Sequence, residues 1–280
     1  MKPIRLSLLA ALIMALCSQV SAQFRMPELP PSEFYTISCG NIQMKIDAAR
    51  GARITSFTFD GQEVISQLDR PNMYGSTFWT SPQKEWNWPP VFEHDLMAYT
   101  VDGSGNEYVM TSQLSQKFPV RIRKKFAADP GDRCIVVTYT IINESDKERK
   151  VAPWEITRVP AQGDIFFDAP LNSITPAGLM PFVKKNGLAW YTIDHDETQN
   201  RKINADGKGW LCYRNDGLLL TKRFDDLTSS QPAPDEAEIQ VYVHKGNVYV
   251  ELESQGEYKT LKPGESLDWT VRWYLEKDEN

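Results

Sequence analysis

Histidine and cysteine are both scarce in this chain, with 3 histidines and 4 cysteines in 280 residues. The histidines lie far apart in the sequence, and no cysteines or histidines have the close spacing of a zinc site. We therefore expect no metal site of this kind and no cofactor. Beyond position 22, three cysteines allow one disulfide in an oxidising compartment and leave one thiol over: Cys39, Cys134 and Cys212.

An excess of positive charge is also missing. The chain has 31 Lys and Arg against 37 Asp and Glu, a formal net charge of −6. A net acidic chain binds nucleic acid poorly because phosphates select basic surfaces, so we expect no nucleic-acid partner. Only Val120–Phe126 is locally basic, and on a strand Arg121, Arg123 and Lys125 would share one face. Such a face is typical of a solvated surface, and contact with an acidic sugar is the alternative.

Long hydrophobic runs are confined to the N-terminus. Lys2 and Arg5 precede an apolar run over residues 6–16, and small residues follow it. This pattern predicts a secretory signal peptide over residues 1–22, with a run too short to cross a bilayer. We expect a mature chain of residues 23–280 without a membrane span, located in the periplasm or secreted. Loss of the two basic residues makes its net charge −8.

A sustained helical repeat is absent as well, and the remaining pattern is that of strands. Apolar runs flank Asp60-Gly61, which is a strong hairpin signal. Arg133–Ile142 is apolar on both faces, which indicates a central strand. Leu267–Leu275 alternates so that both of its tryptophans lie on one apolar face, which indicates core. The sequence predicts one all-β domain over residues 23–280, a large antiparallel β-sandwich.

Tryptophan is concentrated in one segment. Three of the 8 tryptophans lie within Gly75–Pro90, with three prolines that remove backbone donors and block a central strand. The segment is therefore predicted to be a rigid loop. Flat rings beside amide and carboxylate groups suit a sugar, which has an apolar C–H face and a polar rim. The alternative is that the rings cap the core. The candidate binding residues are Trp79, Gln83, Glu85, Trp86 and Trp88.

Two runs near the C-terminus, Glu238–His244 and Asn247–Glu253, are joined by a tight turn and alternate in polarity. One face is apolar, and the other carries Glu251 and Glu253 with two tyrosines, a glutamine and His244. The carboxylates are about 6.5 Å apart along the strand. In a cleft, their repulsion would raise at least one pKa toward that of a general base. The alternative is an ordinary wet face of a sheet.

Three segments share patterns that are known from one superfamily. Gly51–Ile65 looks like its first hairpin, and Leu252–Gln255 followed by Leu261–Leu275 looks like its Leu-Glu-Thr-Gln segment and closing strand. Together they resemble the galactose-mutarotase-like superfamily of the aldose 1-epimerase type. Gly75–Pro90 resembles a branch of that superfamily whose function is unassigned. The resemblance covers nearly the whole mature chain and implies a β-supersandwich fold.

The resemblance implies a catalytic base but no catalytic acid. In the epimerases a glutamate on the penultimate long strand is the base, and the matching residue here is Glu253. The epimerase acid is a histidine, but the matching strand has none and places Trp154 and Arg158 on one face and Glu155 on the other. Glu155, or His94 after the tryptophan segment, is the candidate acid. Arg158 could instead bind a hydroxyl or carboxylate.

These observations leave several functions open. The first is an exported carbohydrate-binding protein that holds a mono- or oligosaccharide in a tryptophan-lined cleft without catalysis. The second is an aldose 1-epimerase-like isomerase with Glu253 as base, and the third is a glycan hydrolase or lyase. The fourth is a structural or interaction sandwich. Trp154, Arg158 and Glu251 complete the candidate binding residues, and the missing histidine favours the first function.

Overall fold

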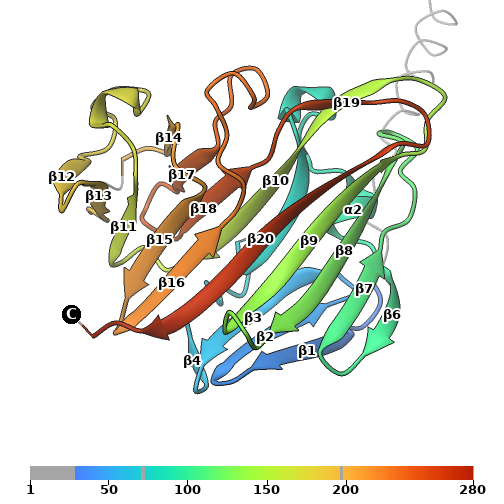
Figure 1. The fold of residues 1–280 in the computed structure, drawn as a ribbon, viewed down its shortest axis with the longest axis horizontal. Helices are drawn as coiled ribbons and strands as arrows, with labels where there is room; N and C mark the ends of the chain where they lie inside the picture. The colour runs from blue at the N-terminus through green and yellow to red at the C-terminus, as the bar shows by residue number, and fades with distance from the viewer. Residues whose placement is uncertain (1–28, 71–72, 196–197, 280) are drawn as a thin grey trace, which may run out of the picture.

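The computed structural model of the protein describes residues 29–70, 73–195 and 198–279. The expected signal peptide, residues 1–22, lies outside the described residues. Within the described ranges, no helix is both long enough and apolar enough to cross a membrane. Strands dominate, and they form two large antiparallel sheets (Figure 1).

The first sheet joins the N-terminal strands to those of the C-terminal hairpin. Its order is β1-β2-β3-β5-β10-β18-β17-β14, with β4 beside β3 and β19 beside β10. The strands are β1 (Phe34–Cys39), β2 (Ile42–Asp47), β3 (Arg53–Phe59), β4 (Gln62–Glu63), β5 (Ser76–Ser81), β10 (Arg149–Val159), β14 (Arg201–Ala205), β17 (Ile239–Val243), β18 (Val250–Gln255) and β19 (Lys259–Leu261). Segments far apart in the chain, such as β5, β10 and β18, therefore become neighbours.

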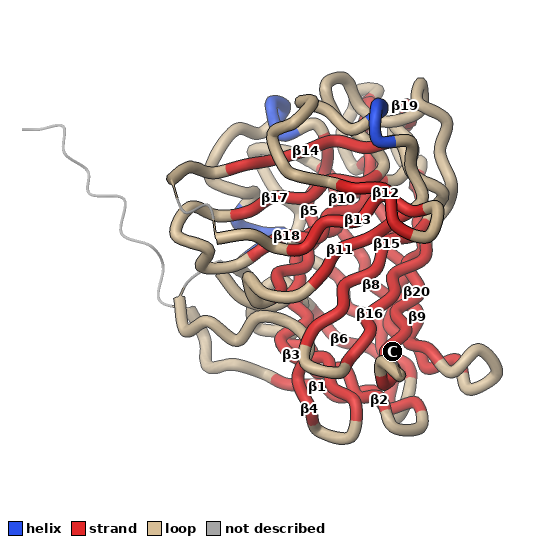
Figure 2. Tube along the Cα trace, turned by 90° about the vertical axis from the view of Figure 1, so that its left-hand side faces the viewer, coloured by secondary structure: helices blue, strands red, loops and turns tan. Residues whose placement is uncertain are grey.

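The second sheet has the order β12-β13-β11-β15-β16-β20-β9-β8-β7-β6. The strands are β6 (Thr100–Ser104), β7 (Glu107–Thr111), β8 (Val120–Asp129), β9 (Cys134–Asn143), β11 (Asp164–Phe167), β12 (Val183–Lys185), β13 (Leu188–Thr192), β15 (Trp210–Asn215), β16 (Leu218–Arg223) and β20 (Ser266–Lys277). Figure 2 shows β9 and β20 on one side and β17 and β18 on the other. Short helical turns lie in the connections: η1 (Gln83–Glu85), α2 (Phe92–Asp95) and η2 (Leu171–Ser173).

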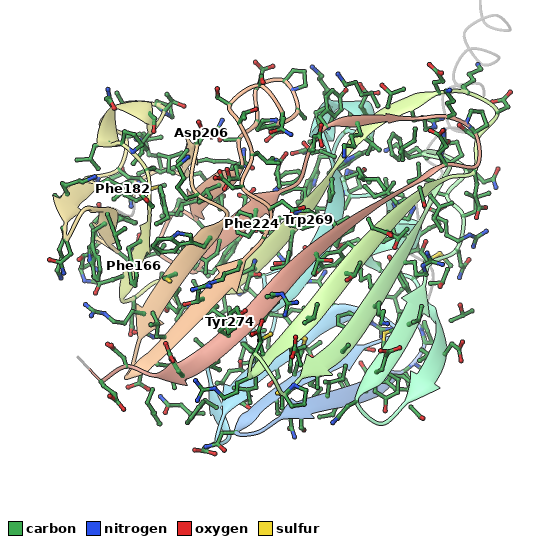
Figure 3. The ribbon with its side chains drawn as sticks, viewed as in Figure 1. Phe166, Phe182, Asp206, Phe224, Trp269 and Tyr274 are labelled. Atoms are coloured by element: carbon green, nitrogen blue, oxygen red, sulfur yellow. The ribbon has the colours of Figure 1, made fainter. Side chains whose placement is uncertain are left out.

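The core lies between the two sheets. Along Leu267–Leu275 of β20, buried side chains alternate with more accessible ones, and Trp269 and Trp273 are 3% and 0% exposed. Trp273 meets Phe57 of β3 with 5.4 Å between ring centres, so aromatic rings interlock across the sheets. Trp269 lies beside Phe224, 6.2 Å away (Figure 3). The predicted all-β antiparallel sandwich is confirmed.

The predicted hairpin at Asp60-Gly61 is also confirmed. β3 pairs with β4 through Phe59 and Gln62. The turn residues both have positive φ, 48° for Asp60 and 82° for Gly61. Aspartate and glycine tolerate this left-handed conformation, which the tight turns of hairpins require.

The tryptophan segment is only partly the loop that its prolines predict. Its first half, Ser76–Ser81, is β5, a fully buried strand between β3 and β10. The prediction of a loop over all of Gly75–Pro90 was wrong because the three prolines come after the strand and none interrupts it. Pro82 follows the end of β5, and the loop that begins with η1 then carries Trp86 and Trp88.

The three described cysteines do not form the disulfide that their number allows. Cys39 of β1, Cys134 of β9 and Cys212 of β15 are all buried free thiols. Burial raises the pKa of each thiol. Because the thiolate is the reactive form, these cysteines are poor nucleophiles.

Candidate functional site

A cleft of about 430 Å³ opens on the first sheet, on the side away from the core, over β10, β18, β17 and β14. It is lined by Met73, Trp79, Gln83, Trp88, Trp154, Arg158, Lys202, Tyr242, His244, Tyr249, Glu251 and Glu253. Other hollows of about 390 to 440 Å³ occur on the described surface, but they do not join tryptophans to paired carboxylates. The cleft is therefore the candidate site.

The strand register brings the charged cleft residues onto one face. Arg158 of β10 lies opposite Glu251 of β18, and Glu251 lies opposite Tyr242 of β17. Tyr242 in turn lies opposite Lys202 of β14. Residues directly opposite each other in antiparallel strands point to the same side, and the period of two adds Glu253 to that side.

Glu253 lies at the floor of the cleft with 1% of its surface exposed. Its Oε2 accepts hydrogen bonds from Trp154 Nε1 at 2.8 Å and from Lys202 Nζ at 2.9 Å. Lys202 Nζ also lies 4.8 Å from the ring centre of Trp154. Oε2 is thus fixed by two donors, while Oε1 accepts no hydrogen bond from the described side chains and is the oxygen available to a ligand.

Glu251 forms the second ion pair of the cleft. Arg158, which is 2% exposed, contacts Glu251 Oε1 at 2.9 Å and also donates to Thr77 Oγ1 at 3.4 Å. Burial raises the pKa of Glu251 to about 7; Arg158 acts in the opposite direction, and Glu253 adds to the increase. Repulsion from Glu253 thus raises the pKa of Glu251, as expected from the sequence, but burial raises it more.

Three tryptophans from two strands and a loop meet at the cleft. The ring centre of Trp79 lies 5.4 Å from that of Trp154 and 6.1 Å from that of Trp88, and both pairs pack edge to face. Trp79 Nε1 donates to Asp95 Oδ1 of α2 at 2.8 Å. Trp88 stands at the rim with 62% of its surface exposed.

The other candidates from the tryptophan segment have different positions. Trp86 is 1% exposed, donates to the carbonyl of Thr80 at 2.8 Å and packs 5.8 Å from the ring centre of Trp79. It therefore supports Trp79 from behind and does not line the cleft. Gln83 lines the cleft, whereas Glu85 does not.

Both candidate acids lie outside the cleft. Glu155 is on the opposite face of β10, fully buried, where it pairs with Lys222 and accepts a hydrogen bond from Tyr139. His94 is 3% exposed, and its Nε2 lies 3.0 Å from the carbonyl of Val120. Burial lowers the pKa of His94 to about 4. Neither side chain reaches a ligand in the cleft.

Lys202 is the main site residue that the sequence analysis missed. It comes from β14, and its partner Glu253 is 51 positions away in the chain. Its strand, Arg201–Ala205, contains no motif that marks it as functional. Alternation assigned Tyr242, Tyr249 and His244 to the face that carries the cleft. No sequence signal showed that this face forms a cleft and is not an ordinary solvent-exposed face of the sheet.

One group of side chains has metal-like spacing within the described residues. The ligand atoms of Asp129, Asp132 and Cys134 lie within 4.8 Å of one another. However, Arg272 contacts the two carboxylates at 2.9 and 3.1 Å. One guanidinium thus bridges both carboxylates, so this group is an ion-pair network.

The two-sheet topology is similar to that of solved galactose mutarotase-like proteins. The chain is similar to such a protein from Lactobacillus casei, with a TM-score of 0.61 and 14% identity over 87% of this chain and 100% of the other. A galactose mutarotase-like protein from Clostridium acetobutylicum gives a TM-score of 0.59 and 10% identity over 88% and 98%. A galactose mutarotase related enzyme from Lactobacillus acidophilus gives a TM-score of 0.56 and 12% identity over 86% of this chain and 97% of the other.

At these identities the likeness shows the fold alone. The galactose mutarotase-like fold expected from the sequence motifs is therefore confirmed. No family model matches the sequence, and no curated protein does.

The raised pKa of Glu251 predicts how stability depends on pH. Its folded pKa is about 7 and its ordinary value is 4.5. A carboxyl group whose pKa rises on folding contributes stability that is complete below the unfolded pKa and is lost as pH rises through the folded pKa. Glu251 is thus expected to contribute a fall of about 3 kcal/mol to the free energy of unfolding between pH 4.5 and 8, seen as the difference between wild type and a variant without this carboxyl group. Urea unfolding at a series of pH values measures this change.

The control for this prediction is Glu251→Gln, which should flatten the dependence. Burial also raises the pKa of Glu238 to about 7, so some slope should remain in that variant. If Glu251→Gln leaves the slope unchanged, Glu251 is not the titrating group.

Proposed function

We propose that the protein is an exported carbohydrate-binding protein that holds a sugar in the tryptophan-lined cleft. The observation that carries the proposal is the meeting of Trp79, Trp88 and Trp154 with two glutamates that are each paired with a cation. Export rests on the signal pattern of residues 1–22.

The cleft offers a sugar both kinds of hydrogen-bonding partner. Each sugar hydroxyl donates one hydrogen bond and accepts others. Glu251 and Glu253 can accept from a hydroxyl, and Arg158 and Lys202 can donate to one. Hydrogen bonds to ionised groups are roughly twice as strong as neutral ones. The ion pairs also fix these groups before a ligand arrives, which lowers the entropy cost of binding.

Glu253→Gln is expected to weaken sugar binding by about 10- to 100-fold. The substitution keeps the shape of the side chain but removes the charge, and a hydrogen bond to a charged group contributes about 1.5–3 kcal/mol. A glycan array of mono- and oligosaccharides identifies ligands, and calorimetric titration of the best ligand measures the loss. The matched control is Glu276→Gln at an exposed position near the C-terminal end of β20, which should bind as wild type does.

Two results would contradict this proposal. Absence of binding to every saccharide on the array would remove the sugar-binding function. Unchanged affinity in Glu253→Gln would place the binding site elsewhere on the protein.

A second candidate function, an aldose 1-epimerase-like isomerase, is favoured by one observation. Glu251, with its pKa raised to about 7, lies beside Glu253 on the same face of β18. Glu253 would take the proton of the anomeric hydroxyl while Glu251 gives a proton to the ring oxygen, and the ring opens. NMR of anomer equilibration for α-glucose and α-galactose tests it, and a rate equal to that without protein rejects it. Release of fragments from polysaccharides would instead indicate a hydrolase or lyase.

A further inference from the structure

We propose that the cleft holds a neutral oligosaccharide, with one ring on its polar floor and the next ring on the open face of Trp88 at its rim. This inference rests on the proposed sugar-binding function and adds the length and charge of the ligand.

The tryptophans on the floor have little free ring face. Lys202 Nζ lies 4.8 Å from the ring centre of Trp154, and the guanidinium carbon of Arg158 lies 5.8 Å from that of Trp79. The two rings also pack edge to face and are only 3% and 8% exposed. Their indole N–H groups are already bonded to carboxylates. The floor therefore recognises a sugar through its charged and hydroxyl groups and offers little surface for stacking.

Trp88, in contrast to Trp79 and Trp154, has a largely exposed ring. It lines the same cleft, yet it is 62% exposed, the largest fraction for any large hydrophobic side chain described. It meets Trp79 at an angle of 79° with 6.1 Å between ring centres, and its exposed fraction shows that ring surface stays open beside this contact. A single exposed hydrophobic residue needs no explanation by itself.

The position of Trp88 at the rim of the cleft suits its exposed ring for ligand binding. The loop that carries it is anchored by the buried Trp86, whose indole N–H bonds to the end of β5. The open ring is thereby held at the edge of a polar cleft. A flat apolar face in this place fits the C–H face of a sugar that extends out of the floor.

The charges of the cleft cancel when both glutamates are ionised. Arg158 pairs with Glu251 and Lys202 pairs with Glu253, each at 2.9 Å, so above the pKa of Glu251 the four charged side chains sum to zero. A uronic acid would need a cation that is not already paired. It would also bring a like charge toward two glutamates, which costs binding energy. A neutral sugar meets neither obstacle.

The size of the cleft agrees with more than one ring. Its volume of about 430 Å³ lies within the range of about 300–1,000 Å³ that is typical of clefts for drug-sized ligands. A disaccharide belongs to that size class, whereas a single hexose is smaller.

The test compares matched ligands by calorimetry. The pairs are methyl glucoside with cellobiose, methyl mannoside with mannobiose, methyl galactoside with galactobiose, and galacturonic acid with digalacturonic acid. Wild-type protein is expected to bind at least one neutral disaccharide about 5- to 30-fold more tightly than its monosaccharide, which is the contribution typical of an aromatic anchor. Trp88→Ala should reduce this ratio to about one, and Trp88→Phe should keep most of it. The control Phe34→Ala removes a ring of β1 that is 50% exposed and does not line the cleft, and it should not change the ratio.

The outcomes separate this inference from the proposed function. If no sugar of the panel binds, the proposed function fails and the inference fails with it. If monosaccharides bind but no disaccharide binds better, or if Trp88→Ala weakens both members of a pair equally, only the inference is overturned. Tighter binding of digalacturonic acid than of every neutral disaccharide would overturn the inference that the ligand is neutral.

Discussion

Lys222→Met is expected to lower the free energy of unfolding by about 3–5 kcal/mol. Lys222 and Glu155 form an ion pair in which both side chains are 0% exposed. Lys222 Nζ also donates to Thr157 Oγ1 at 2.8 Å and lies 4.9 Å from the ring centre of Trp273. Methionine fills a similar volume, but it leaves the Glu155 carboxylate buried without a cation, and an unpaired buried charge is costly.

We expect this loss of stability to come from the unpaired charge and not from a change in side-chain volume. The double variant Lys222→Met/Glu155→Gln removes both charges and keeps an acceptor for the Tyr139 hydroxyl, which donates to Glu155. Replacing a buried pair by uncharged groups is often neutral, so this variant should regain most of the lost stability. Urea unfolding followed by circular dichroism measures both variants. A single variant as stable as wild type, or a double variant no better than the single, would show that the pair is not charged in the folded protein.

Strand alternation predicted much of the fold and the face that each candidate residue of β10 and β18 occupies. Trp154 and Arg158 point to the cleft, and Glu155 points away from it, as the period of two along β10 requires. The same rule placed Glu251 and Glu253 together. Alternation acts within one strand, so it is read directly from the sequence.

Pairing between distant strands could not be predicted in this way. Lys202 reaches Glu253 only because β14 lies next to β17, and this order depends on the packing of the whole sheet. No local pattern marks His94 as buried. It is buried because α2 packs beside β5, and its Nε2 lies 3.0 Å from the carbonyl oxygen of Val120. Burial of this kind depends on tertiary contacts that local sequence does not encode. The loop prediction for β5 failed for a related reason, since prolines mark where a strand stops but not where it begins.

Trp86→Ala is expected to reduce stability by about 3–5 kcal/mol and to weaken sugar binding, although Trp86 does not line the cleft. The side chain is 1% exposed, so its loss leaves a cavity, and the carbonyl of Thr80 loses its indole donor. Trp79 loses the ring that supports it from behind at 5.8 Å, and Trp79 in turn contacts both Trp154 and Trp88.

Trp86→Phe separates packing from hydrogen bonding at this position. Phenylalanine keeps an aromatic ring against Trp79 but cannot donate to Thr80, so a loss of about 1–3 kcal/mol is expected, with sugar affinity close to that of wild type. Urea unfolding gives the stability of each variant, and calorimetry at a temperature where each is folded gives the affinity. A loss of affinity in both variants without loss of stability would mean that the Trp86 indole touches the sugar itself. The rim loop would then have to move when the ligand binds, because the indole is now covered by the residues around it.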